Sequence, residues 1–239
     1  MHRYLPNALT LGNLFCGCCA VLFILNGRVQ EAALFTVGSF LLDYADGLAA
    51  RALGVASPLG KELDSLADVV SFGVAPGALF YHMLSASACP DAWELYPPNS
   101  VRIGICYLGL PAFILSAFAG LRLGRFNLDT RQTQHFIGLT TPATTVFVLG
   151  LALASAENRF GINAWLLQLP VLYGLIGLLS VLMNSNIPMF GLKFGGPAWW
   201  LPLVFLGLFL GLWWPLRELA LSVVVVCYVV ASVCWLNES

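Results

Sequence analysis

Charged residues are scarce in this chain of 239 residues. Asp, Glu, Lys and Arg make up 10% of it, whereas soluble domains carry about 25%. With 59% apolar residues and a mean hydropathy of +0.84, the chain has too little polar surface for a soluble domain. The formal net charge of −1 also excludes a nucleic-acid partner held by bulk basic charge. We therefore expect an integral, multi-pass membrane protein.

Long polar segments are also missing, and apolar runs fill most of the chain. A transmembrane helix needs about 20 mainly apolar residues. The apolar runs predict helices near residues 9–25, 32–53, 64–85, 102–123, 141–155, 165–183, 199–213 and 217–235. The expected fold class is therefore all-α: a polytopic membrane helix bundle of about eight transmembrane helices, in a single membrane domain over residues 1–239.

Lysine and arginine are divided unevenly between the helix ends and loops on the two sides of the membrane. With the N-terminus inside, seven are cytoplasmic: Arg3, Arg51, Lys61, Arg122, Arg125, Arg131 and Lys193. Four are on the other side: Arg28, Arg102, Arg159 and Arg217. Cytoplasmic loops carry an excess of Lys and Arg, so we expect a cytoplasmic N-terminus. An even number of helices then makes the C-terminus cytoplasmic too.

The seven cysteines do not indicate a disulfide framework. Six of them lie inside apolar runs, where a free cysteine behaves as a small hydrophobic residue. Their odd number points the same way. We therefore expect no disulfide framework in this protein.

Acidic residues gather where a membrane protein normally avoids them, in residues 43–77. Asp43 and Asp46 lie three residues apart, which puts them on one face of a helix. Asp64 and Asp68 lie four apart, with the same result. Each carboxylate at membrane depth costs about 2.5–3.5 kcal/mol, and a bound divalent cation would offset that cost. In the alternative interpretation the acids cap helices or face a cytoplasmic loop, and Asp64 could cap the helix after it.

The ligands that this acidic segment offers are all oxygens. Such a set fits Mg²⁺ or Mn²⁺, as two ions, and does not fit Zn²⁺. Mg²⁺ usually joins a few carboxylates to substrate phosphates. Small residues that allow close approach, and donors for phosphate oxygens, surround the acids: Gly47, Ala50, Arg51, Ser57, Gly60 and Lys61. We therefore expect a diphosphate site at the cytoplasmic face of the membrane.

Eight of these positions form one pattern, D-x2-D-G-x2-A-R-x8-G-x3-D-x3-D. Its residues are Asp43, Asp46, Gly47, Ala50, Arg51, Gly60, Asp64 and Asp68. The pattern resembles the complete signature of the CDP-alcohol phosphotransferase family, with every spacing intact. The resemblance implies that the four aspartates hold two divalent cations, that Asp68 is the general base, and that the Gly, Ala and Arg positions bind the CDP group.

The same resemblance implies a six-helix core, here residues 1–183, and makes residues 184–239 two additional helices. Asn7 and Thr10 resemble the polar pair that meets the nucleotide end of the donor in this family. Asn7 could instead, or in addition, be the N-cap of the first helix.

Three further stretches resemble the phosphatidylserine synthase branch of this family: DSLADVVSFGVAPG at 64–77, LRLGRFN at 121–127 and FIGLTTPA at 136–143. Gly124 stands where Ala is usual in this branch, and Thr140 stands where Pro is usual. These two departures weaken the assignment of the acceptor but leave the expected reaction unchanged. The resemblance implies transfer from CDP-diacylglycerol to L-serine at the cytoplasmic face of the membrane, which is the inner membrane in a bacterium.

A serine acceptor brings a carboxylate and needs a cation near the metal site. Arg122 and Arg125, with Asn127 as a polar contact, are the expected serine-binding residues. The alternative is that both arginines are topology anchors or pair with lipid headgroups. Rival acceptors are glycerol phosphate, inositol and choline. A cation transporter would also place acids at membrane depth, but it would not need the glycine and arginine spacing. We further expect a homodimer.

Overall fold

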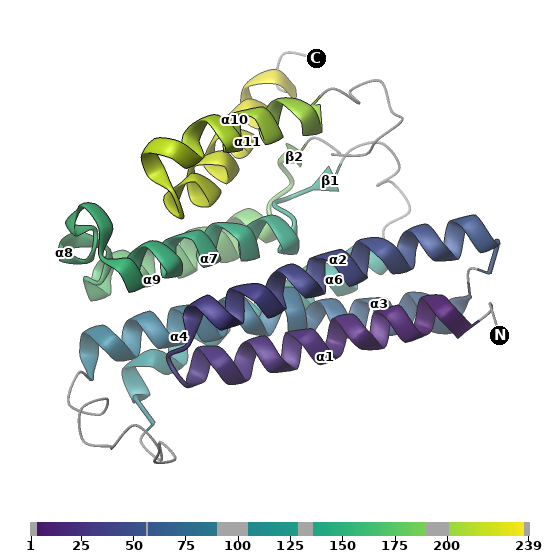
Figure 1. The fold of residues 1–239 in the computed structure, drawn as a ribbon, viewed down its shortest axis with the longest axis horizontal. Coiled ribbons are helices and arrows are strands. Elements are labelled where there is room, and N and C mark those ends of the chain that lie inside the picture. The colour runs from purple at the N-terminus through teal and green to yellow at the C-terminus, as the bar shows by residue number, and fades with distance from the viewer. Residues whose placement is uncertain (1–3, 56, 90–104, 129–135, 190–200, 237–239) are drawn as a thin grey trace.

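The protein is almost entirely helical in the computed structural model, which describes residues 4–55, 57–89, 105–128, 136–189 and 201–236 (Figure 1). Its α-helices are α1 (Leu5–Leu25), α2 (Val29–Leu53), α3 (Pro58–Asp68), α4 (Ala75–Ala88), α6 (Phe113–Leu128), α7 (Thr141–Glu157), α8 (Asn163–Leu166), α9 (Leu169–Asn184), α10 (Leu201–Leu216) and α11 (Leu219–Leu236). A π-helical segment, η2 (Val69–Val74), and two 3₁₀ segments, η3 (Tyr107–Ala112) and η4 (Arg159–Gly161), complete the helical elements.

One small strand pair departs from the all-α expectation. Strands β1 (Phe136–Ile137) and β2 (Pro188–Met189) are antiparallel, with Phe136 opposite Met189. The pair joins the segment before α7 to the segment after α9. Within the described ranges the expectation of a helical bundle is otherwise confirmed.

The helix bounds follow the predicted runs, with three differences. The predicted helix at 102–123 continues to Leu128, and the predicted helix at 165–183 is divided into α8 and α9. The predicted starts at residues 102 and 199 lie outside the described residues. The third difference concerns the helix expected to begin at residue 64, which begins six residues earlier, at Pro58.

The helix from Pro58 to Ala88 is continuous through α3, η2 and α4, over 31 residues. Ser57 is its N-cap, because its Oγ accepts a hydrogen bond of 3.0 Å from the amide of Gly60. Asp64 therefore lies inside the helix, and the interpretation of Asp64 as a cap is wrong. Tyr4 caps α1, so Asn7 is also inside its helix and is not its N-cap.

Among the described residues, four helical stretches are long and apolar enough to cross a membrane: Leu5–Leu25, Val29–Leu53, Pro58–Ala88 and Tyr107–Leu128. Shorter apolar helices follow in α7, α9, α10 and α11. Large apolar side chains such as Phe15, Leu34 and Leu41 are exposed on α1 and α2, which suits a surface in contact with lipid. This is the organisation of a multi-pass membrane protein.

Small residues allow the central helices to approach closely. Gly73 and Gly77 face α6, where a Cβ on Gly73 would lie 3.2 Å from the Cβ of Ala119. The Ser116 hydroxyl of α6 donates a hydrogen bond of 2.8 Å to the Gly73 carbonyl. Lipid tails are as apolar as leucine, so close packing and such hydrogen bonds hold helices together in a membrane. Helix α4 lies at the centre, with Phe80 and Leu84 fully buried.

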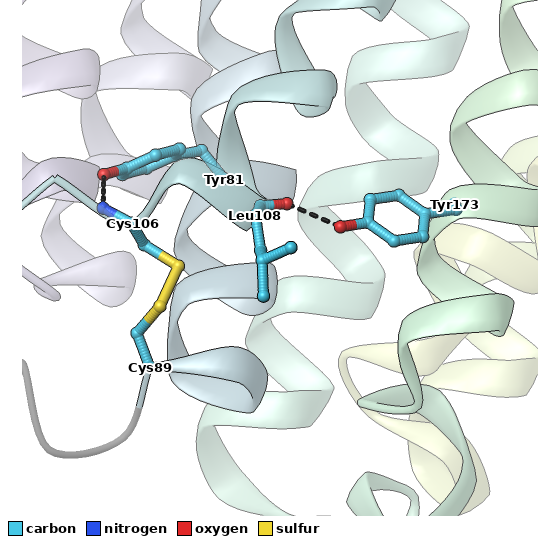
Figure 2. The surroundings of a disulfide bond; sticks show 5 residues. All are labelled: Tyr81, Cys89, Cys106, Leu108 and Tyr173. Atoms are coloured by element: carbon cyan, nitrogen blue, oxygen red, sulfur yellow. Dashed lines mark hydrogen bonds between the residues drawn. A yellow bond between two sulfur atoms is a disulfide. The ribbon is translucent and has the colours of Figure 1, made fainter.

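A disulfide links Cys89, at the end of α4, to Cys106, directly before η3 (Figure 2). Their Cα atoms are 6.2 Å apart. The Cys106 amide donates to the Tyr81 hydroxyl at 3.1 Å, and the Tyr173 hydroxyl donates to the Leu108 carbonyl at 2.7 Å. The expectation of no disulfide framework is wrong for this pair, because the end of α4 and the start of η3 lie close together. The other five cysteines are free.

Candidate active site

Three carboxylates from two helices form one compact group, which we call the acid group. It consists of Asp43 on α2 and of Asp64 and Asp68 on α3, and their ligand oxygens all lie within 4.8 Å of one another. The four-residue spacing on α3 turns Asp64 and Asp68 to the same side, as the sequence predicted. Three carboxylates this close repel one another strongly. Their donor set, hard oxygens only, fits a divalent cation such as Mg²⁺ or Mn²⁺.

Asp46 lies beside the acid group but is directed toward α1. It is 7% exposed, and its Oδ2 accepts a hydrogen bond of 2.5 Å from the Thr10 hydroxyl. The same hydroxyl also lies 3.0 Å from the Pro6 carbonyl. Thr10 therefore orients Asp46, a contact that the sequence did not predict.

A polar cleft of about 210 Å³ opens on one side of the acid group, between α1, α2 and α3. Asp46 and Asp64 line it. So do seven residues that the sequence assigned to the CDP group: Asn7, Thr10, Gly47, Ala50, Ser57, Gly60 and Lys61. A Cβ on Gly60 would lie 3.2 Å from both Asn7 Oδ1 and Ser57 Oγ. The missing side chain therefore leaves room at the floor of the cleft.

Arg51, the remaining residue of that predicted set, is exposed near the end of α2. Its guanidinium nitrogens lie 3.8 Å from the position that a Cβ on Gly47 would take. The guanidinium therefore lies next to Gly47, which is part of the polar cleft.

A larger, mainly apolar cavity of about 480 Å³ opens on the other side, and Asp68 and Arg122 both line it. Its apolar walls include Phe40, Phe126 and Phe205. We call it the apolar cavity. The acid group therefore faces two spaces of different character, because Asp64 lines the polar cleft and Asp68 lines the apolar cavity.

Arg122 is buried inside the bundle, with 7% of its surface exposed. The sequence placed it at the cytoplasmic end of a helix, whereas it lies inside α6, which continues to Leu128. Without Arg122 the balance of Lys and Arg is six against four. Its Nε has no hydrogen-bond partner among the described residues.

The other two residues expected to bind serine lie elsewhere. Arg125 is exposed. The Asn127 amide nitrogen donates a hydrogen bond of 2.7 Å to Ser65 Oγ, and the Asn127 carbonyl accepts one of 3.3 Å from Lys61 Nζ. Neither residue lines the apolar cavity, so Arg122 alone of the three is brought together with Asp68.

Sequence reasoning missed Asn13, which connects α1 to Asp68. Its side-chain amide lies 3.5 Å from Asp68 Oδ1, as the donor, and its Oδ1 accepts a hydrogen bond from the Ser39 hydroxyl. The Ser71 hydroxyl donates to the Asn13 carbonyl at 3.2 Å. Asn13 is fully buried. A signal was present, because Asn13 follows Thr10 by three residues and so shares its helix face.

Comparison with known proteins agrees with this arrangement. The CDP-alcohol phosphatidyltransferase family matches residues 3–176. A CDP-diacylglycerol–serine O-phosphatidyltransferase of Bacillus subtilis is 36% identical over 140 residues, which cover 59% of this chain and 70% of that protein. The Helicobacter pylori protein of the same name is 34% identical over 184 residues, or 76% of this chain and 70% of that protein.

An archaeal protein is similar over a comparable length. The archaetidylserine synthase of Methanothermobacter thermautotrophicus is 31% identical over 185 residues, which cover 77% of this chain and 68% of that protein. The family match includes α1 to α3 with all four aspartates, and so the whole acid group and polar cleft. The chain is a multi-pass membrane enzyme that belongs to the CDP-alcohol phosphatidyltransferase family.

Proposed function

We propose that this protein transfers the phosphatidyl group of CDP-diacylglycerol to L-serine, forming phosphatidylserine and releasing CMP. One observation supports this most: the acid group lies between a polar cleft and an apolar cavity that contains a buried arginine. The polar cleft suits a charged nucleotide, the apolar cavity suits a lipid, and the buried arginine suits an acceptor that carries a negative charge. The names of the two bacterial relatives supply the donor and the acceptor.

The polar cleft would bind the CDP part of the donor. Asn7, Ser57 and Lys61 offer polar atoms along its walls. Gly47 and Gly60, together with Ala50, leave the backbone open to close approach. Arg51 would bind phosphate oxygens at the edge of the cleft through its planar guanidinium.

Asp68 would act as the general base. It accepts the proton of the serine hydroxyl while the hydroxyl oxygen forms a bond to the phosphorus that carries diacylglycerol. The bond from that phosphorus to the oxygen of CMP breaks, and CMP leaves with the electron pair. Asn13, 3.5 Å from Oδ1, would hold the Asp68 carboxyl in position. Direct transfer is favoured because, among the described residues, no cysteine lines either space. Ser57, the serine that lines the polar cleft, already accepts a hydrogen bond from the Gly60 amide as the N-cap of α3.

Two divalent cations, Mg²⁺ or Mn²⁺, would bind to Asp43, Asp46, Asp64 and Asp68 and would neutralise charge on the diphosphate. The three aspartates of the acid group are already close enough to share one ion. Asp46 lines the polar cleft, from which it could contribute to a second ion.

Arg122 would bind the serine carboxylate, because it is the cation that lines the apolar cavity together with Asp68. Arg125 is exposed and Asn127 is bonded to Ser65. We therefore assign Arg125 to anchoring the cytoplasmic end of α6, which was the alternative for the arginines, and we assign Asn127 to the contact between α6 and α3.

The active site would face the cytoplasm, at the inner membrane in a bacterium, with both termini on the same side. The disulfide supports this orientation, because disulfides persist on the oxidising side of a membrane. Cys89 follows Asp68 by 21 residues of nearly continuous helix, or about 30 Å at roughly 1.5 Å per residue. We further propose a single domain over 1–239 with eight crossings, in which residues 184–239 add two helices to a six-helix core of residues 1–183. The homodimer stays a prediction.

Release of CMP from CDP-diacylglycerol by the purified protein in detergent micelles tests the proposal. We expect release that depends on L-serine, and little with glycerol 3-phosphate, inositol or choline. The Asp68→Asn variant controls for contaminating activity. Faster release with one of the other alcohols would replace serine as the acceptor. No release with any acceptor would contradict the transferase proposal.

A further inference from the structure

The last helix, α11, contributes to the apolar cavity although it lies outside the segment that matches the family. The family match ends at residue 176, whereas α11 comprises Leu219–Leu236. Tyr228 of α11 nevertheless lines the same cavity as Asp68 and Arg122, and it is only 5% exposed. A residue of an appended helix is therefore within range of the reacting groups.

Helix α11 packs closely against α7. The Ser222 hydroxyl donates a hydrogen bond of 2.8 Å to the Phe147 carbonyl of α7. A Cβ on Gly150 would lie only 2.5 Å from Ser222 Oγ, so the two backbones meet at this glycine. Ser222 and Tyr228 both belong to the buried face of α11. Figure 1 shows α10 and α11 lying across α7 on one side of the bundle.

Two buried polar groups of the apolar cavity have no protein partner among the residues that the structure describes. One is Arg122 Nε and the other is Thr141 Oγ1, on a residue that is 1% exposed. Both residues line the cavity. A buried polar group without a partner is destabilising and uncommon in native proteins. Thr140, next in line, differs because its hydroxyl accepts a hydrogen bond from the Ala143 amide. Both unpaired groups therefore belong to residues of the cavity wall and are available to bind a molecule there.

We infer that Thr141 and Tyr228 join Arg122 in a subsite for the carboxylate of the amino-acid acceptor, so that α11 completes the active site and sets acceptor specificity. This inference rests on the proposed function. A carboxylate offers only acceptor lone pairs, and the guanidinium and the two hydroxyls are donors that match it. Two further polar residues line the cavity, and the described lining is otherwise apolar. Asp68 receives the proton of the acceptor hydroxyl, and the Thr140 hydroxyl caps α7.

The volume of the cavity agrees with this division. About 480 Å³ is more than a serine needs, and the remaining walls are phenylalanine, valine, leucine, alanine and proline side chains. They would contact the diacylglycerol end of the donor, so that both substrates of the reaction meet beside Asp68.

The test compares acceptors in hydroxyl-deletion variants of the full protein. Tyr228→Phe and Thr141→Val should each raise the KM for L-serine about tenfold, since each removes one hydrogen bond to a charged group. The kcat and the KM for CDP-diacylglycerol should change little, which is the pattern for loss of uniform binding of one substrate. The preference for L-serine over L-serinamide, which lacks the carboxylate, should fall by a similar factor.

Two controls separate this role from a structural one. Tyr173→Phe also deletes a tyrosine hydroxyl, but that hydroxyl bonds to Leu108 near the disulfide (Figure 2), so serine kinetics should match the wild type. Thr141→Ser keeps the hydroxyl and should restore the low KM. If the Tyr228→Phe protein fails to accumulate, the comparison of Thr141→Val with Thr141→Ser tests the inference.

Wild-type preference for serine over serinamide in both deletion variants, with a KM within twofold of normal, would overturn the inference. The proposed function would survive that result, because the variants would still release CMP with serine. Absence of serine-dependent CMP release in the wild type would instead overturn the proposed function itself.

Discussion

At the scale of single residues, the candidate chemistry depends on how neighbours orient the acids. Asp68 shares its acid group with Asp43 and Asp64 and contacts Asn13. Asp46 is held by Thr10. Spacing along each helix predicted that the acids would face one another, but these polar contacts come from another helix and had no counterpart in the local pattern.

Replacing Asp68 by Asn should separate proton transfer from binding. The amide keeps the size of the side chain and one oxygen but cannot accept the serine proton. We expect turnover to fall by about 10²–10⁴, the usual contribution of a positioned base. Binding of CDP-diacylglycerol, measured by competition with a labelled donor, should change little. Near-normal turnover would rule out Asp68 as the base.

Replacing Asn13 by Leu should show whether the contact with Asp68 matters. The variant loses the hydrogen bond to Asp68 and leaves the Ser39 hydroxyl without its side-chain acceptor. We expect a fall in kcat of about tenfold and a loss of stability of about 1–3 kcal/mol.

Thr36→Val is the matched control for Asn13. Thr36 is equally buried in α2, but its hydroxyl bonds only to the Ala32 carbonyl of its own helix. Steady-state kinetics should therefore be unchanged in this variant. An equal fall in kcat for both variants would mean that the Asn13 effect is general destabilisation.

At the scale of elements, the continuous helix from Pro58 to Ala88 connects the acid group to the disulfide. A π-helical segment directly follows Asp68, and such segments often occur at functional sites. Ser71 of this segment packs against α1, where a Cβ on Gly17 would lie 3.0 Å from the Ser71 Cα. The helix therefore approaches α1 closely just beyond Asp68.

Removing the disulfide should change stability and leave the chemistry intact. Cys89 and Cys106 are 17 residues apart in sequence, and closing a loop of that size stabilises by about 3 kcal/mol. We expect the double variant Cys89→Ser, Cys106→Ser to have a lower Tm in detergent and normal kcat. Labelling of free thiols before and after reduction provides the check on the bond. A loss of kcat at a temperature where the variant is folded would contradict this separation.

At the scale of the whole molecule, the acid group lies between two spaces that are built by different parts of the chain. The polar cleft comes from α1, α2 and α3, within the first 64 residues. The apolar cavity draws on α2, α3, α6, α7, α10 and α11. The polar cleft is therefore local in sequence, whereas the apolar cavity depends on helices from most of the chain.

Removing divalent cations should stop the reaction of the intact protein. The acid group offers only carboxylate oxygens, so EDTA should abolish serine-dependent CMP release. Mg²⁺ or Mn²⁺ should restore it, and Ca²⁺ should restore it poorly because Ca²⁺ prefers longer and less regular coordination. Donor binding in the presence of EDTA, followed separately, shows whether the ions act in binding or in turnover. Full activity in the chelator would contradict a metal site at these aspartates.

The sequence alone determined the class of protein, the positions of the helices and the local half of the site. Apolar runs specify membrane helices because lipid tolerates few polar groups, and spacings of three or four residues place side chains on one helix face. Seven of the eight residues expected around CDP line one cleft, and all of them lie within the first 61 residues. Only the tertiary structure decided which distant helices meet. It brought Asn13 to Asp68, buried Arg122 and placed Tyr228 of α11 in the apolar cavity. These residues are brought together from positions 54 or more apart, and their meeting depends on how whole helices pack, which no local spacing encodes.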